Sequence, residues 1–169
     1  WINEPFEQNP KHPEQLTVKT ISGKMVRSKS EAFIDMLLYT NKIPFRYECA
    51  LTLGDTTYYP DYTIMHPKTG EIFYWEHFGM MDDPIYAGKT FSKLHTYSKY
   101  GIIPTIDLIT TYETGNNPLD LDDVQKIIEV LQNLDTSLDK IMATKDNDIF
   151  ILNTKDIVCF YSEEKSNYC

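Results

Sequence analysis

The sequence lacks long apolar runs and metal-binding or disulfide-forming cysteine motifs. No stretch of eighteen apolar residues exists, which argues against a membrane span. The three cysteines, Cys49, Cys159 and Cys169, are odd in number and far apart, so no disulfide framework is expected. No HExxH or CxxC motif supports a zinc site. These absences, and the lack of a basic stretch followed by an apolar one, predict a cytoplasmic protein without a membrane partner.

The 169 residues contain no internal repeat, low-complexity tract or linker. This length suffices for one domain with its own core and is short for two. Residue 1 is Trp rather than Met, which is compatible with a chain that begins partway through a longer product. A structural or regulatory domain of such a product is therefore one hypothesis for its role.

The net charge of −9 is unevenly distributed along the chain. Residues 1–100 carry a net charge of −1, and residues 101–169 carry −8. Local basic groups therefore persist in the first part, at Lys24, Arg27 and Lys29 and at Lys89, Lys93 and Lys99. Phosphate binding depends on such local patches more than on the total charge. The acidic excess argues only against a broad surface that binds nucleic acid tightly.

Apolar periodicity and turn residues predict an α/β fold with an antiparallel hairpin at the centre of a mixed sheet flanked by helices. The predicted elements are a helix from about 29 to 40, strands at 45–53, 57–65 and 71–78, a helix at 85–100, a strand at 102–112 and a helix at 119–134. Residues 1–23 are predicted to be an irregular arm, 24–136 the core, and 137–169 an extension with a hairpin of 149–152 and 157–161.

Glu76 raises a question, because it lies in the otherwise apolar run Phe73-Tyr74-Trp75-Glu76-His77-Phe78. Burying an ionised carboxylate costs on the order of several kcal/mol of folding free energy unless another group pairs with it. If residues 67–70 form a four-residue loop, Asp61 lies directly opposite Glu76 in the hairpin. Opposed residues share a face and stand about 4.5–5.5 Å apart. A three- or five-residue loop would instead place the two acids on opposite faces.

Two carboxylates on one face repel each other unless one is protonated or a cation lies between them. Mg²⁺ and Mn²⁺ prefer carboxylate oxygens, so the four-residue loop predicts a divalent metal site at Asp61 and Glu76. The alternative interpretation is a solvent-exposed strand in which Asp61 is only a turn residue after Pro60.

The chain also resembles a known family. The resemblance extends from about residue 22 to 114 and is carried by Pro60-Asp61, by Trp75-Glu76-His77-Phe78-Gly79, by Arg27-Ser28-Lys29-Ser30-Glu31, by Ile43-Pro44-Phe45-Arg46-Tyr47-Glu48 and by Tyr97 through Gly101-Ile102. This pattern resembles the PD-(D/E)xK nuclease superfamily, in particular small bacterial and mobile-element proteins. The resemblance implies a restriction-endonuclease-like core whose central hairpin presents two acids to a divalent metal.

The same resemblance assigns roles to individual residues. Asp61 and Glu76 would hold the metal, and Glu31 on the preceding helix would complete its site, although Glu31 is also a typical first-turn helix acid. Phe78 stands where the family has a lysine that assists the attacking water. Lys89 and Lys93 lie four residues apart on the next helix, hence on one face, and a lysine there can replace it; Lys93 is the first candidate and Lys89 the second. Both lysines are equally compatible with a solvated basic face.

Three functional hypotheses follow. The leading one is a Mg²⁺- or Mn²⁺-dependent nuclease acting on nucleic acid, with DNA favoured, in which Lys24, Arg27 and Lys29 contact backbone phosphates. Tyr97 is grouped with these contacts because Lys93-Leu94-His95-Thr96-Tyr97 resembles the QxxxY motif of some nucleases. The alternative is an inactive nuclease-fold module that binds nucleic acid or a protein, which Phe78 favours. The third is the structural or regulatory domain named above.

Overall fold

The computed structural model describes residues 1–133, 140–145 and 148–153. These residues belong to two compact units, Trp1–Gln132 and Asn133–Cys169. The first unit contains an α/β core together with residues 1–23, which were predicted to form an irregular arm. The described part of the second unit is a hairpin of β9 (Lys140–Lys145) and β10 (Asp148–Asn153).

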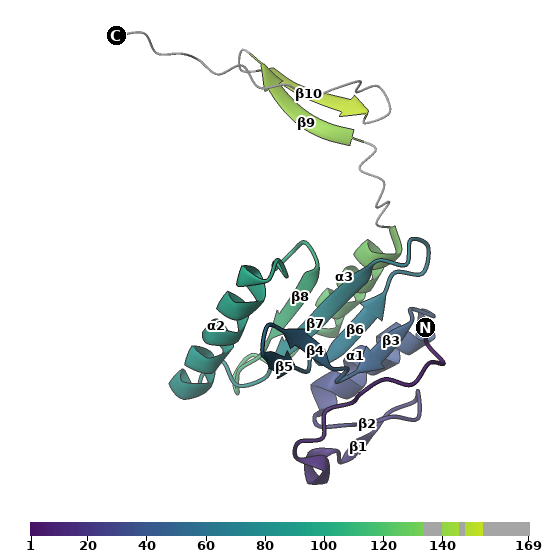
Figure 1. Cartoon of the computed structure of the whole chain (residues 1–169), viewed down its shortest axis with the longest axis vertical. Helices are drawn as coiled ribbons and strands as arrows, with labels where there is room; N and C mark the ends of the chain where they lie inside the picture. Colours follow the sequence, from purple (N-terminus) through teal and green to yellow (C-terminus); the bar gives the residue numbers. More distant parts are fainter. Residues whose placement is uncertain (134–139, 146–147, 154–169) are drawn as a thin grey trace. The chain divides into compact units, whose positions relative to one another are not determined.

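A four-stranded mixed sheet forms the core of the first unit (Figure 1), in agreement with the sequence-based prediction. Its strands lie in the order β3 (Phe45–Tyr47), β6 (Tyr62–Met65), β7 (Ile72–Phe78) and β8 (Leu108–Tyr112). The first three are antiparallel, and β8 is parallel to β7. Parallel neighbours need a crossover connection, which α2 (Pro84–Lys99) provides.

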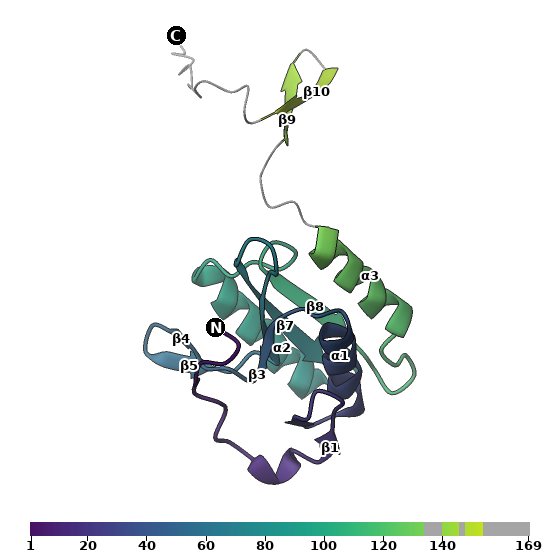
Figure 2. The same ribbon diagram turned by 90° about the vertical axis from the view of Figure 1, so that its right-hand side faces the viewer.

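Helices cover both faces of this sheet (Figure 2). On one face, the α1 (Lys29–Thr40) backbone accepts a hydrogen bond from Tyr62, and the α3 (Leu121–Asn133) backbone contacts His66. On the other face, α2 contacts Glu76 through Tyr97. The helix starts follow from the sequence: Ser28 caps α1, and Asp83 followed by Pro84 begins α2.

Two predicted strands are interrupted. The first, at 45–53, divides into β3 and β4 (Leu51–Leu53), because Glu48 has a φ of 47° that no regular strand accommodates. The second, at 57–65, divides at Pro60 into β5 (Thr56–Tyr58) and β6. The strands β4 and β5 then pair as a separate hairpin around Gly54, whose φ of 60° suits the turn.

Two further predictions need correction. The strand predicted at 102–112 is confined to β8, because residues 103–107 form turns closed by hydrogen bonds to the Ile103 carbonyl. The strand predicted at 149–152 lies within β10, but it pairs with β9 rather than with residues 157–161. Residues 157–161 lie outside the part of the chain that the structure describes.

The first 23 residues contact the body of the first unit. The hairpin of β1 (Val18–Lys19) and β2 (Met25–Val26) crosses the predicted boundary at residue 24. The Arg46 guanidinium lies over the rings of Trp1 and Phe6, 4.3 and 4.8 Å from their centroids. Cation–π contacts of this kind anchor the start of the chain at the edge strand β3.

Candidate metal and catalytic site

The central hairpin has the register that the sequence predicted. Tyr62 pairs with Trp75 and Ile64 with Phe73 across β6 and β7, and a four-residue loop joins the two strands. Gly70 ends this loop with a φ of 77°. Asp61 precedes Tyr62 and Glu76 follows Trp75, so the register places both acids on the same face, the face that α2 covers. The three- and five-residue loops are excluded.

The four predicted catalytic residues line one open pocket of about 220 Å³ between this face and α2. Asp61 and Glu76 come from the hairpin, and Lys89 and Lys93 come from the helix. The acids and the lysines are far apart in the sequence, but the crossover connection after β7 places α2 over the face of the sheet that carries the acids. A pocket of this size has room for a hydrated ion and a phosphate group.

Glu76 is the most deeply buried group in this pocket, with 2% of its surface exposed. The Lys93 Nζ atom lies 2.6 Å from Glu76 Oε1. The Tyr97 hydroxyl donates a hydrogen bond of 2.7 Å to the same oxygen. The charge that makes Glu76 tolerable inside the protein is therefore the Lys93 ammonium, supported by Tyr97, where the sequence analysis had expected a divalent cation alone.

Asp61 is only partly buried and lies at the mouth of the pocket. Its Oδ2 atom accepts a hydrogen bond of 2.6 Å from the His77 backbone N–H. Burial and the negative charge of Glu76 raise the pKa of Asp61 well above its ordinary value, although Lys93 partly offsets the effect. Two carboxylates thus share one lysine, and without a further cation the raised pKa favours a proton on Asp61; a divalent cation that displaced this proton would fit the donor set.

Asp61→Asn should stabilise the metal-free protein at neutral pH. Because folding raises the pKa of Asp61, its carboxyl costs stability that grows as pH rises above the unfolded-state pKa and levels off above the folded-state pKa. The variant removes this cost and keeps the acceptor for the His77 N–H. Its advantage in unfolding free energy should grow from pH 4 to pH 8 in EDTA and vanish below about pH 4, near the unfolded-state pKa of Asp. Urea denaturation at several pH values measures it; equal stability throughout would contradict the charge assignment.

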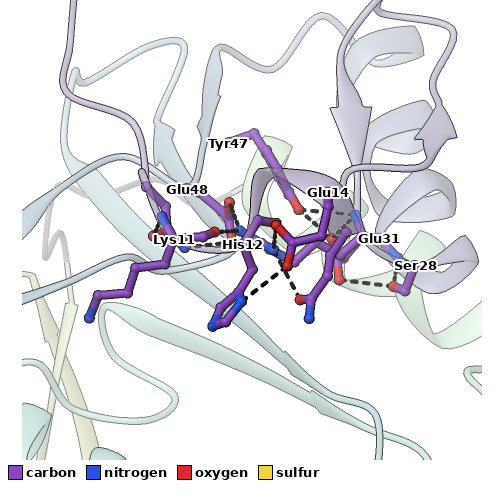
Figure 3. A network of polar contacts seen from close by, with 10 residues as sticks. Lys11, His12, Glu14, Ser28, Glu31, Tyr47 and Glu48 are labelled. Carbon is purple, nitrogen blue, oxygen red and sulfur yellow. Dashed lines mark hydrogen bonds and ion pairs between the residues drawn. The ribbon is translucent and has the colours of Figure 1, made fainter.

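Glu31, the predicted third metal ligand, lies in a different network of contacts (Figure 3). Its carboxylate accepts hydrogen bonds from the Ser28 hydroxyl, the Arg27 backbone N–H and the Tyr47 hydroxyl. Among the described residues, no group of three or more Asp, Glu, His or Cys side chains is placed to hold a metal. The pocket therefore offers two acids, and Glu31 serves here as a helix-capping acid.

Arg27, which was predicted to contact phosphate, has its guanidinium donors engaged within the protein. Nε and Nη2 bind the two oxygens of Glu48 at 2.7 and 3.0 Å. The remaining N–H groups donate to the Lys11 and His12 carbonyls and to Gln15. Arg27 therefore fastens the N-terminal segment to the turn at Glu48.

The other predicted nucleic-acid contacts also lie away from the pocket or inside the protein. The side chain of Tyr97 is completely buried and donates a hydrogen bond to Glu76. Lys24 is half-buried, with its ammonium 4.2 Å from the centre of the Phe45 ring. Lys29 is exposed at the start of α1 but does not line the pocket. None of these residues supplies the basic wall of the site.

The position of the family's lysine is filled by a buried aromatic ring. Phe78 is 3% exposed and stacks on Tyr112, with the ring centroids 5.5 Å apart. His77 points away from Glu76, as strand parity predicted, and its ring contacts Thr111 and Glu113. An ammonium nevertheless reaches the acids from Lys93, the residue that the sequence analysis preferred as a replacement.

Sequence reasoning missed two further residues of the pocket, Tyr86 and Thr90. With Lys93 and Tyr97 they recur at intervals of three and four along α2, which places them on one helix face. That periodicity was available in the sequence. It mixes polar and aromatic residues, however, so it does not stand out as an apolar stripe.

Comparisons of this chain with protein-family models, curated proteins and solved structures found no match. Within the described residues, no helix has both the length and the apolar character needed to cross a membrane.

Proposed function

We propose that this protein is a metal-dependent nuclease that hydrolyses phosphodiester bonds, with DNA as the favoured substrate. The observation that carries the proposal is the convergence of Asp61, Glu76 and Lys93 on one pocket. Two carboxylates and one ammonium around an open pocket are a combination suited to binding a cation together with a phosphate.

The arrangement of the elements supports a restriction-endonuclease-like fold. The core contains α1, three antiparallel strands, the crossover helix α2 and the parallel strand β8. The acids lie on the central hairpin, where the resemblance to the PD-(D/E)xK superfamily places them. The register of β6 and β7 follows from the length of the loop between them, so it supports the position of the two acids independently of the family resemblance.

Asp61 and Glu76 would hold Mg²⁺ or Mn²⁺. Mg²⁺ commonly binds through one or two carboxylates and keeps several waters or substrate phosphate oxygens, so two acids suffice. Bound there, the metal supplies a water of lowered pKa and polarises the phosphate.

The chain's own residues orient and neutralise the reacting groups. Tyr97 fixes Glu76 by donating to Oε1. Burial alone would lower the pKa of Lys93, but the attraction of Glu76 and Asp61 raises it above its ordinary value. Lys93 therefore keeps its proton at neutral pH. Its positive charge would stabilise negatively charged phosphate oxygens, and it would not act as a base. Lys89, which is exposed beside it, offers a second phosphate contact.

Metal removal tests this function. The purified protein should nick supercoiled plasmid or shorten single-stranded DNA when Mg²⁺ or Mn²⁺ is present, and EDTA should abolish the cleavage. Gel electrophoresis measures the products, and restoring Mg²⁺ after EDTA is the control for irreversible loss. Cleavage that continues in EDTA, or none with either metal on DNA or RNA, would contradict the proposal.

The second candidate is an inactive nuclease-fold module that binds nucleic acid. Two observations favour it: Phe78 fills the lysine position, and Lys93 is held by Glu76 at 2.6 Å. Such a module would bind without cutting. Replacing Lys89 and Lys93 together distinguishes the two functions, because the nuclease would lose its turnover, whereas the module has none to lose.

A further inference from the structure

A second groove lies along α2 and is continuous with the acidic pocket. It has a volume of about 510 Å³ and is lined on the helix side by Ile85, Gly88, Lys89, Ser92, Lys93 and Thr96. Lys89 and Lys93 line both this groove and the pocket that contains Asp61 and Glu76. A chain molecule that fills the groove therefore reaches the acids without leaving the protein surface.

The opposite wall of the groove is Tyr58, at the end of the β4–β5 hairpin. This hairpin is held against α2: the Tyr58 ring packs edge-on against Tyr97, with 5.4 Å between centroids. At the hairpin tip, Gly54 lies so close to the Tyr100 hydroxyl that a Cβ would collide with it. The half-buried Tyr58 ring is thus a fixed aromatic wall rather than a mobile side chain.

The chemistry of the groove suits a polyanion that carries flat rings. No acidic side chain lines it, although the whole chain has a net charge of −9. Gly88 lies in the middle of α2, where glycine weakens a helix, yet an added Cβ would meet nothing within 4 Å. Packing within the protein therefore does not require this glycine. Its small size instead leaves the groove open for a ligand.

We propose that this groove binds one strand of nucleic acid, with Lys89 and Lys93 contacting phosphates and Tyr58 stacking against a base. The inference rests on the proposed nuclease function and specifies its substrate as single-stranded. Stacking on an aromatic ring needs an unpaired base. Two lysines also match a single strand better than a duplex, whose binding typically uses about 6–10 phosphate contacts. Glu76, only 2% exposed, is reached more readily by a flexible strand than by a rigid double helix.

Fluorescence anisotropy with fluorescein-labelled oligodeoxythymidine in EDTA tests this groove without any cleavage. Gly88→Leu should weaken binding by about tenfold or more while thermal stability stays equal or rises, because leucine favours helices. Tyr58→Leu should weaken binding by about tenfold through lost stacking. Lys89→Gln should also lower the slope of log affinity against log salt by about 0.7, the value for one phosphate contact on a single strand. Lys68→Gln, in the β6–β7 loop, is the control and should bind as the wild type does.

The outcomes separate this inference from the proposed function. Unchanged binding in both Gly88→Leu and Tyr58→Leu would overturn the groove, as would tighter binding of a duplex of equal length. If the wild type cleaves DNA while the groove variants bind and cleave normally, strand binding in the groove is rejected and the nuclease proposal is retained. If the groove variants lose binding while the wild type cleaves nothing, the nuclease falls and the strand-binding groove stands.

Discussion

Glu76→Gln and Asp61→Asn should each reduce Mg²⁺-dependent cleavage by about 1,000-fold, the scale on which a group that organises transition-state charge acts. Both substitutions preserve shape and remove one carboxylate from a pocket that offers two. Glutamine at position 76 can still accept the hydrogen bond from Tyr97. The loss should therefore come from the missing charge rather than from a disturbed fold, and gel assays of plasmid and single-stranded DNA measure it.

The matched control for these variants is Glu71→Gln. Glu71 is an exposed acid on the same hairpin, at the end remote from the pocket, where its backbone carbonyl pairs with the His66 N–H. Its cleavage rate should match that of the wild type. Rates for Asp61→Asn and Glu76→Gln that equal the Glu71→Gln rate would remove both acids from the mechanism.

Lys93→Met should lower the free energy of unfolding by about 3 kcal/mol, because it leaves the buried Glu76 carboxylate without its ion-pair partner. Lys93 Nζ lies 2.6 Å from Glu76 Oε1, and only 2% of Glu76 is exposed, so water in the pocket would replace the ammonium only in part. Methionine keeps the length of the lysine stem and its contacts. Urea denaturation in EDTA at neutral pH measures the change.

Two companion variants identify the source of this loss. Lys89→Met removes a lysine from the same pocket, but the structure shows no ion pair for Lys89 among the described residues, so the change should cost less than about 0.5 kcal/mol. The double variant Lys93→Met with Glu76→Gln should recover most of the stability, because the orphaned charge is gone. A loss that is the same with and without Glu76 would show that Lys93 stabilises the protein by packing alone.

The site was predictable where it depends on local geometry. The loop of residues 67–70 fixes the register of β6 and β7, and the register decides which acids share a face. Lys89 and Lys93 are four apart on a helix, so they necessarily face the same way. The crossover from β7 to the parallel strand β8 contains α2, which lies on the face of the sheet opposite α1.

The features that sequence reasoning missed depend on contacts between distant residues. Nothing near Arg27 in the sequence indicates that its guanidinium binds Glu48 and the carbonyls of residues 11 and 12. The first predicted strand breaks at Glu48 because this residue has a positive φ. Its side chain is the one that forms the ion pair with Arg27. The likeness to the QxxxY motif groups Tyr97 with the nucleic-acid contacts, but it does not indicate that this side chain is buried against the β4–β5 hairpin.

The central claim is that Asp61 and Glu76 together bind a divalent cation, and a calorimetric titration of Mn²⁺ into the metal-free protein tests it most directly. The account predicts one Mn²⁺ per wild-type chain and no measurable binding at the same concentrations in the Asp61→Asn, Glu76→Gln double variant. Mn²⁺ binding of equal stoichiometry and affinity in the double variant, or none in the wild type, would contradict it.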